Sequence, residues 1–174
     1  NWHEKVKEQE RGFTFENRYA RLDWKTTDGD FDHLNESSNK EENVDDQLEW
    51  VAFKNQFFST VMISKDGFDK GADLHSVAYD KKDQENNQVR YLQDLTAKMK
   101  ATFAPRGQKP TELEFYIGPN DFYILKDVQK QSTFGKDLDL ERVVFLGWPL
   151  FRIINRWFTL PVFTFLTNAG IPMG

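Results

Sequence analysis

Three aspartates, Asp28, Asp30 and Asp32, stand at alternate positions in the segment DGDFD, a spacing that could bind a metal ion. Such a spacing opens a calcium-binding loop, which also needs a glycine at its sixth position and a glutamate at its twelfth. His33 and Asn39 occupy those two positions here. Because three carboxylates without the remaining ligands bind Ca²⁺ weakly, we interpret the segment as a solvated acidic loop and predict no metal site.

Glu112 and Glu114 have the spacing of a possible acid–base pair. A working pair needs an enclosing pocket and shifted pKa values, whereas two such residues in a strand point to the same polar face. The three histidines, His3, His33 and His75, lie far apart and lack the HxxxH or HExxH spacing of a zinc site. No nucleophile elbow and no phosphate-binding glycine loop occur. The sequence therefore predicts no catalytic residue, no cofactor and no enzymatic activity.

The composition favours a β-rich body and argues against a nucleic-acid surface. A chain of 174 residues suffices for one domain with a core, plus an appendage. Lys and Arg number 23 against 28 Asp and Glu, whereas binding to phosphates needs clustered cations. Sixteen phenylalanines make the apolar share unusually aromatic, which is typical of strands. Cysteine is absent, so disulfides and cysteine zinc sites are excluded.

Alternating apolar and polar residues predict several antiparallel strands. Residues 19–25 and 94–103 have the period of two expected where a strand buries one face and exposes the other to water. Residues 111–117 follow the second of these after a turn, so the two are predicted to form a hairpin. Its last strand would bury Leu113, Phe115 and Ile117 and expose Glu112, Glu114 and Tyr116.

Weaker signals predict the rest of the body. Residues 49–63 are rich in aromatic and β-branched side chains, which favours one strand with a bulge over a helix. Residues 26–47 are acidic with few apolar anchors, which predicts a long mobile loop. In the predicted turn at 65–71, Gly67 and Gly71 are free to adopt positive φ.

Two short elements complete this prediction. A short strand is expected at 75–80, after the turn. The period then changes near Pro119 and Asn120, where Phe122, Leu125 and Val128 fit a short helix.

The stretch GWPLFRIINRWFTLPVFTFL, residues 147–166, is far more apolar than anything before it. A membrane-spanning helix needs about 20 apolar residues, and the uncharged run that starts at Trp157 is shorter and interrupted by Pro161, so no span is predicted. Leu150, Ile153, Ile154 and Trp157 fall on one helical face, and Arg152 and Arg156 fall on another. The spacing therefore predicts an amphipathic helix over 147–160.

Two environments fit this helix. Flanking tryptophans and arginines that extend toward headgroups are typical of a helix that lies in a membrane interface. The same apolar face would equally suit a helix docked on the β body, because periodicity does not identify what covers a face. On the residues alone, both interpretations stay open.

Three segments together carry a resemblance to a known family. They are EWVAFKNQFFSTVMIS at 49–64, LEFYIGPNDFYILK at 113–126 and FLGWPLFRIINRWFTLPVFTFLTNAGIPMG at 145–174. In order and spacing they resemble the YidC membrane-protein insertases of Bacteroidetes-type bacteria. The combination is specific, whereas each segment alone is a weak signal.

The resemblance implies a mostly β fold, an antiparallel β-supersandwich similar to that of galactose mutarotases, here partial, with short helices and a C-terminal amphipathic helix. Residues 1–141 would be the C-terminal portion of the periplasmic β-sandwich domain. Residues 142–174 would form the interfacial helix and the lead-in to the transmembrane core. The implied location is the bacterial inner membrane, with this portion on the periplasmic side.

Proteins of this family insert and help fold inner-membrane proteins, alone or with the Sec translocon. The implied partners are nascent inner-membrane proteins, Sec translocon components and the lipid bilayer surface, and no nucleic acid. The implied site is a membrane-interface helix formed by Trp148, Leu150, Phe151, Arg152, Ile153, Ile154, Arg156, Trp157 and Phe158.

Two rival functions belong to other classes. A carbohydrate-binding or mutarotase-like domain is the alternative, because the implied fold permits it, although fold alone does not carry function. A groove lined by exposed tryptophan and a saturable response to sugar would favour it. A purely structural or partner-docking module is the third possibility.

Overall fold

The computed structural model describes residues 2–8, 13–34, 39–80, 90–104, 107, 110–144 and 155–169. The chain divides into two compact units, Asn1–Val143 and Val144–Gly174. Each unit is described by itself below.

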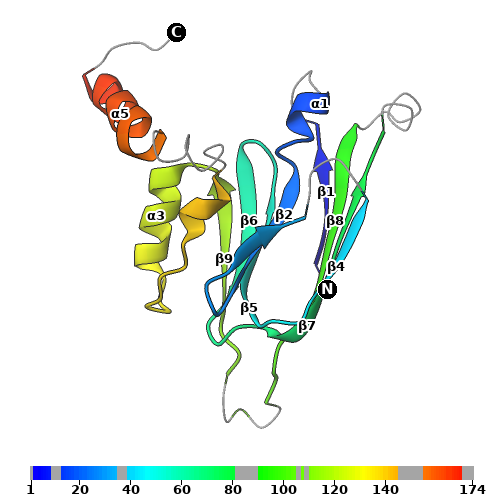
Figure 1. The fold of residues 1–174 in the computed structure, drawn as a ribbon. Helices are drawn as coiled ribbons and strands as arrows, with labels where there is room; N and C mark the ends of the chain where they lie inside the picture. The colour runs from blue at the N-terminus through cyan, green and yellow to red at the C-terminus, as the bar shows by residue number, and fades with distance from the viewer. Residues whose placement is uncertain are drawn as a thin grey trace. The chain divides into compact units, whose positions relative to one another are not determined.

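The first unit contains two antiparallel sheets (Figure 1). The first sheet has the strand order β1 (Trp2–Lys7), β8 (Tyr91–Lys100), β7 (Asp69–Ala78) and β4 (Lys40–Val44). The second sheet has the order β3 (Phe31–His33), β2 (Arg21–Thr26), β5 (Leu48–Lys54), β6 (Phe58–Ser64) and β9 (Leu113–Pro119). The predicted mostly antiparallel β architecture is confirmed and is consistent with a β-sandwich.

The hydrophobic core contains side chains from both sheets. Leu95 and Ala97 of β8 are fully buried, as the alternation over 94–103 predicted, whereas Phe103 lies beyond the end of the strand and is exposed. From the second sheet, β2 and β5 contribute alternate residues to the same core. The main members are Leu22, Trp24, Val51, Phe53, Leu74, Leu92, Leu95 and Ala97.

The prediction of one bulged strand over 49–63 is wrong, because β5 and β6 form a hairpin. The Asn55 side chain makes the turn: its Oδ1 accepts hydrogen bonds from the backbone N–H groups of Phe57 at 2.8 Å and Phe58 at 2.7 Å. An asparagine that bonds to the backbone two or three residues ahead stabilises a turn without glycine or proline. The aromatic residues on either side obscured this signal.

The interpretation of residues 26–47 as a loop is wrong for 31–33 and 40–44. β3 pairs with β2, and β4 pairs with β7. Two apolar anchors hold the start of the segment, since Phe31 packs on Trp50 with ring centroids 5.8 Å apart and Leu34 is buried. Backbone hydrogen bonding to existing sheet edges thus compensates for the low apolar content.

The predicted turn at 65–71 is confirmed at both glycines, with φ of 82° at Gly67 and 84° at Gly71. The strand that follows is longer than the predicted 75–80. β7 begins at Asp69, and its pairing with β8 shifts register between Asp69 and Asp73. Gly71 lies within this irregularity, where its positive φ allows the strand to bulge and continue.

β9 does not form the predicted hairpin with β8. It pairs with β6 in the second sheet, whereas β8 belongs to the first. The predicted burial is also reversed: Phe115 and Ile117 are 59% and 77% exposed, whereas Tyr116 is buried. Register explains this, because Phe115 lies opposite Met62 on the core-facing side of β6, where the described strands of the first sheet do not cover it.

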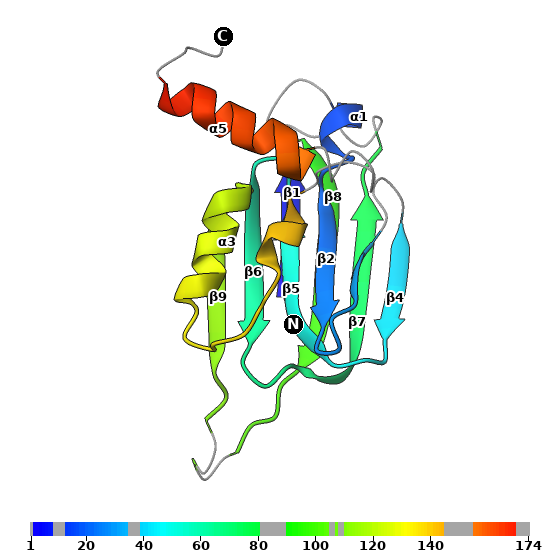
Figure 2. The same cartoon turned by 60° about the vertical axis from the view of Figure 1, so that its left-hand side comes forward.

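The face of the second sheet that points away from the first sheet lies under α3 (Phe122–Gln131) and the 3₁₀ helix η1 (Leu140–Val143), as Figures 1 and 2 show. The short helix predicted after Pro119 is thus confirmed. Asp121 is its N-cap, and its carboxylate accepts the backbone N–H groups of Tyr123 and Ile124, each at 2.9 Å. Phe122 and Leu125 bury its apolar side.

A tight turn connects β9 to α3. The Tyr116 hydroxyl donates to the carbonyl of Pro119 at 2.6 Å and so lies directly over Gly118. A Cβ at Gly118 would come within 2.6 Å of that hydroxyl oxygen and 2.8 Å of the ring Cζ. Only glycine leaves room for the tyrosine here, which explains why glycine follows Ile117 in the YIGP sequence.

We therefore expect Gly118→Ala to lower the free energy of unfolding by about 1–3 kcal/mol, the usual cost of overpacking. Urea unfolding of the single and double variants checks this. In a Tyr116→Phe background the nearest clashing atom is gone, so the alanine should cost less. Strictly additive costs would contradict the proposed clash.

The described part of the second unit is helical. A π-helical turn, η2 (Asn155–Thr159), leads into α5 (Leu160–Asn168), so the helix continues past the predicted end at residue 160. Pro161 lies in the first turn of α5, directly after the π-helical turn, at a position where a missing backbone N–H is tolerated. Among the described residues, no helix is long and apolar enough to cross a membrane.

Candidate functional site

Most of the predicted membrane-interface helix lies outside the described residues. This holds for Trp148, Leu150, Phe151, Arg152, Ile153 and Ile154, and for the side chain of Arg156. Trp157 and Phe158 are described, and within η2 they are 77% and 68% exposed.

The sequence-based prediction ended the apolar face of this helix at Phe158, which is too early. Phe165 of α5 is 70% exposed and Val162 is partly exposed, and both follow Phe158 at the helical spacing i, i+4, i+7. No charged residue occurs from Trp157 onward. Continuing the periodicity through Pro161, which fits a first helical turn, would have found these two residues.

The second surface of interest is the outer face of the second sheet, where sequence reasoning expected solvent. β2 is buried along its whole length, including Arg21, Asp23 and Lys25. These three lie opposite Lys54, Ala52 and Trp50 of β5, so their side chains share one face with Lys54. A register shift then leaves Glu49 as an extra residue on β5, and its carboxylate lies 3.1 Å from Lys25.

The charges on this face form what we call the ion cluster: Arg21, Asp23, Lys25, Glu49 and Lys54. Arg21 pairs with Asp23 through Nε at 2.6 Å and through a second nitrogen at 3.1 Å, and Lys54 Nζ lies 4.0 Å from the same carboxylate. All five residues are nearly inaccessible to solvent. Buried charges are stable only when paired and hydrogen-bonded, so this arrangement requires a cover that also supplies acceptors.

Residues 136–143, which we call the strap, supply that cover. Lys25 Nζ donates to the carbonyl of Asp137 at 2.8 Å and lies 3.1 Å from the Asp139 carboxylate. Lys54 Nζ donates to the carbonyl of Val143, and the Trp50 indole donates to the carbonyl of Leu138 at 2.7 Å. Leu138, Leu140 and Val143 are themselves fully buried. The strap thus closes the outer face through both polar and apolar contacts.

The residues first considered for metal chemistry are not brought together. His75 pairs with Glu41 across β7 and β4 at 3.3 Å, and His33 lies beside Asp32 at 3.9 Å. In the described ranges, no group of three or more His, Cys, Asp or Glu residues could hold a metal ion. The side chain of His3 lies outside those ranges.

Glu112 and Glu114 have separate partners rather than a shared site. Glu112 forms an exposed ion pair with Lys65 at 2.7 Å. Glu114 accepts the Ser132 hydroxyl at 2.7 Å and the Thr133 backbone N–H at 2.9 Å, together with the Thr133 hydroxyl. It therefore anchors the residues that follow α3. Burial raises the pKa of Glu114, but these hydrogen bonds together outweigh that effect and lower it from 4.5.

A lowered pKa means that the charged form of Glu114 stabilises the fold. Its contribution is complete above 4.5, the ordinary value, and is lost as pH falls through the lower pKa of the folded state. We expect Glu114→Gln to reduce stability at neutral pH and to lose this effect in acid. Urea unfolding across that pH range measures the difference. Glu112→Gln is the control, and an equal pH-dependent loss there would contradict the anchoring role.

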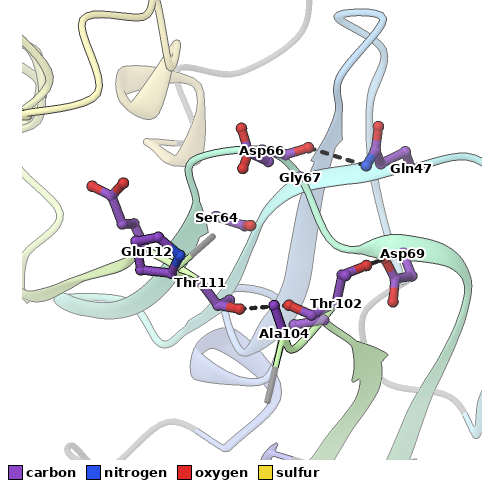
Figure 3. Close-up of a pocket in the computed structure, with 11 residues that line it drawn as sticks. Gln47, Ser64, Asp66, Gly67, Asp69, Thr102, Ala104, Thr111 and Glu112 are labelled. Atoms are coloured by element: carbon purple, nitrogen blue, oxygen red, sulfur yellow. Dashed lines mark hydrogen bonds between the residues drawn. The ribbon is translucent and has the colours of Figure 1, made fainter. Parts of the chain in front are cut away.

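One open pocket of about 250 Å³ lies between the β6–β7 turn and the connection from β8 to β9 (Figure 3). Polar and apolar residues both line it, and the polar groups bond to one another: Gln47 donates to the carbonyl of Asp66 at 3.1 Å, and Thr102 donates to Asp69 at 2.7 Å. Thr111 donates to the carbonyl of Thr102. These bonds leave few groups directed at a ligand, so the pocket does not support a binding site.

Comparison with known proteins gives one consistent result. The profile of the YidC periplasmic domain matches residues 1–164. Proteins named membrane protein insertase YidC are similar over nearly the whole chain: 44% identical over 174 residues in Phocaeicola vulgatus, 38% over 174 in Bacteroides fragilis and 29% over 168 in Porphyromonas gingivalis. The alignments cover 100%, 100% and 95% of this chain and 27%, 27% and 25% of these relatives. The chain thus spans about a quarter of their length. No solved structure matches it.

Proposed function

Because this chain belongs to the YidC periplasmic domain family, we propose that it is the periplasmic portion of an insertase that inserts and helps fold proteins of the bacterial inner membrane. The observation that carries the proposal is the match of that family over residues 1–164. Nascent inner-membrane proteins are the proposed substrates, and components of the Sec translocon are proposed partners.

We propose that residues 147–160 lie along the outer surface of the inner membrane. Large apolar side chains that stay exposed in a helix need a covering partner, and a lipid surface covers Trp157 and Phe158 without requiring a matched protein groove. Arg152 and Arg156 would meet lipid phosphates and set the depth of the helix. The exposed positions Val162 and Phe165 extend the same apolar surface.

We further propose that the β body has no catalytic role. The two glutamates of the candidate acid–base pair are engaged in separate structural contacts, and the polar groups of the pocket bond to each other. The carbohydrate-binding alternative gains no support from the described tryptophans of the body, because Trp24 and Trp50 are both buried. A sugar-binding groove would need such rings on its surface.

Complementation tests the proposed function. Cells depleted of their own insertase would receive the full-length gene, and insertion of a reporter inner-membrane protein would be followed by its accessibility to protease. We expect insertion to be restored, and to be reduced when residues 147–160 are replaced by a polar linker. No restoration by the full-length protein, together with saturable sugar binding by this chain, would overturn the proposal in favour of a carbohydrate-binding domain.

A further inference from the structure

The second sheet has exposed apolar side chains on its core-facing side, at the end formed by β6 and β9 (Figure 2). Its main contacts with the first sheet are made by β2 and β5. Met62 of β6 still packs against the core, whereas Phe58 on the same face of that strand is 57% exposed. Ile117 of β9 lies opposite Thr60 of β6 and is 77% exposed, and Leu113 is also exposed. Phe58, Leu113 and Ile117, which we call the apolar strip, thus continue the core out to solvent.

β9 itself is firmly held in the sheet. It pairs with β6 along all seven of its residues. On its opposite face Tyr116 is buried, and Glu114 accepts the Ser132 hydroxyl at 2.7 Å. In the described part of the chain, no strand pairs with its second edge. The apolar strip therefore belongs to a fixed sheet edge rather than to a loosely attached segment.

The other three edge strands have features that prevent further strand pairing. β3 is only three residues long, and β4 exposes the charged side chains of Lys40, Glu41 and Glu42. β1 places Glu4 opposite Leu95, on the core-facing side, where burial already raises the pKa of its carboxyl. Short length, exposed charge and inward-pointing charge are the usual protections of a sheet edge. These three edges are therefore suited to remain open.

β9 has none of these protections along its core-facing side. It is seven residues long, and its residues on that side, at positions 113, 115, 117 and 119, are all uncharged and apolar. Pro119 cannot donate a backbone hydrogen bond, but it stands at the last position of the strand. A long apolar edge of this kind is a template for another strand and aggregates when it is left open. The native protein therefore needs a cover for this edge.

We propose that the second edge of β9 pairs with a further strand of the same full-length protein, supplied by a segment outside these 174 residues, and that this strand covers the apolar strip. The chain spans about a quarter of the length of its relatives, so most of a protein of that length lies outside it. Because Met62 connects the strip to the core, the cover is a permanent part of the fold rather than a transient partner. This inference uses the length of the relatives and does not depend on the proposed function.

The chemistry of the covering strand follows from the face that it completes. Residues directly opposite each other on paired strands share one face of the sheet. The residues opposite Leu113 and Ile117 should therefore be apolar, and they should alternate with polar residues or with residues buried by another element. A charged residue at these positions would be placed against the apolar strip without a partner.

Cross-linking in the full-length protein tests the occupant. A photoreactive phenylalanine analogue replaces Ile117, and mass spectrometry identifies the attached peptide. The control replaces Val77, which is also exposed but lies on the outer face of the first sheet. We expect the analogue at position 117 to attach within the same molecule to a segment outside these 174 residues, and the control to give no such product. A covalent dimer, attachment to another protein, attachment within these 174 residues or no product would each overturn the proposal.

Hydrogen exchange in the full-length protein tests the strand pairing. We expect Ile117→Asp to accelerate exchange of the β9 amides by at least about ten-fold, as for a loss of about 1.4 kcal/mol in pairing free energy. Exchange of the β4 amides should not change, and Val77→Asp should leave β9 exchange as in the wild type. Unchanged β9 exchange in Ile117→Asp would overturn the proposal. Should Ile117→Asp fail to fold, Ile117→Ser gives the same comparison with a milder change.

The outcome is separable from that of the proposed function. If complementation restores insertion but the analogue at position 117 gives no attachment within the molecule, the covering strand is refuted and the insertase function stands. If the attachment forms but insertion is not restored, the covering strand stands and the insertase function is refuted.

Discussion

Asp23→Ala is expected to lower the free energy of unfolding by about 3–5 kcal/mol, the cost of removing one partner from a buried ion pair. Asp23 is fully buried, and its carboxylate pairs with both Arg21, at 2.6 Å, and Lys54, at 4.0 Å. Alanine would leave these two cations in a desolvated site with less compensation. Since domains of this size are stable by only about 5–15 kcal/mol, the variant would lose a large part of its stability.

Equilibrium urea unfolding, followed by tryptophan fluorescence, measures this effect. Glu112→Ala is the matched control, because it also removes an acidic partner of a cation, Lys65, but at an exposed position. An exposed pair of this kind contributes only about 0–1 kcal/mol. A loss of similar size in both variants would contradict this expectation, because burial of the ion cluster would then have no special energetic weight.

The ion cluster is a feature that the sequence did not predict. Alternation over 19–25 correctly predicted a strand, because period two reports which residues share a face. It does not report what lies over that face. The cover arrives from residues 136–143, and the contact from Lys25 to the Asp137 carbonyl joins positions 112 apart in the chain. Because Lys and Asp are rarely buried, residue type predicted that this face is exposed to solvent. In the structure its charges are paired and covered.

Local signals gave better predictions than long-range ones. The helix at 122–131 was predicted from apolar spacing and its starting residues, and the positive φ values of Gly67 and Gly71 from turn chemistry. β8 and β9 also alternate as strands should, yet they belong to different sheets. Their assignment to one hairpin failed because strand pairing depends on partners distant in sequence, which alternation does not encode.

In β9, residue type likewise failed to predict which side chains are buried. Hydrophobic type predicted that Phe115 and Ile117 face inward, and they do lie on the core-facing side of the second sheet. The described strands of the first sheet do not extend over them, so they stay exposed. Tyr116, counted as polar, is buried on the opposite face because its hydroxyl has a partner in the Pro119 carbonyl.

The second large effect concerns membrane binding by the second unit. We expect the double variant Ile154→Asp/Trp157→Asp to weaken binding of this chain to anionic liposomes by roughly 100- to 10,000-fold. Burying a large apolar side chain contributes about 1.5–3 kcal/mol, so two such losses give about 3–6 kcal/mol, and every 1.4 kcal/mol is about ten-fold in affinity. Repulsion between the new carboxylates and anionic lipid acts in the same direction. Liposome co-flotation measures the loss.

The decisive control places the same substitutions on another exposed apolar surface. Tyr123 and Ile124 of α3 are 41% and 44% exposed, so Tyr123→Asp/Ile124→Asp adds the same charge without touching the second unit. If the membrane contact lies in the helix that contains Trp157, this control should bind liposomes almost as the wild type does. Equal release of both variants would point to a general effect of charge. If instead Ile154→Asp/Trp157→Asp bound lipid normally and unfolded at a much lower temperature, the helix would be an element docked on protein, because its apolar face would then be stabilising the fold rather than contacting lipid.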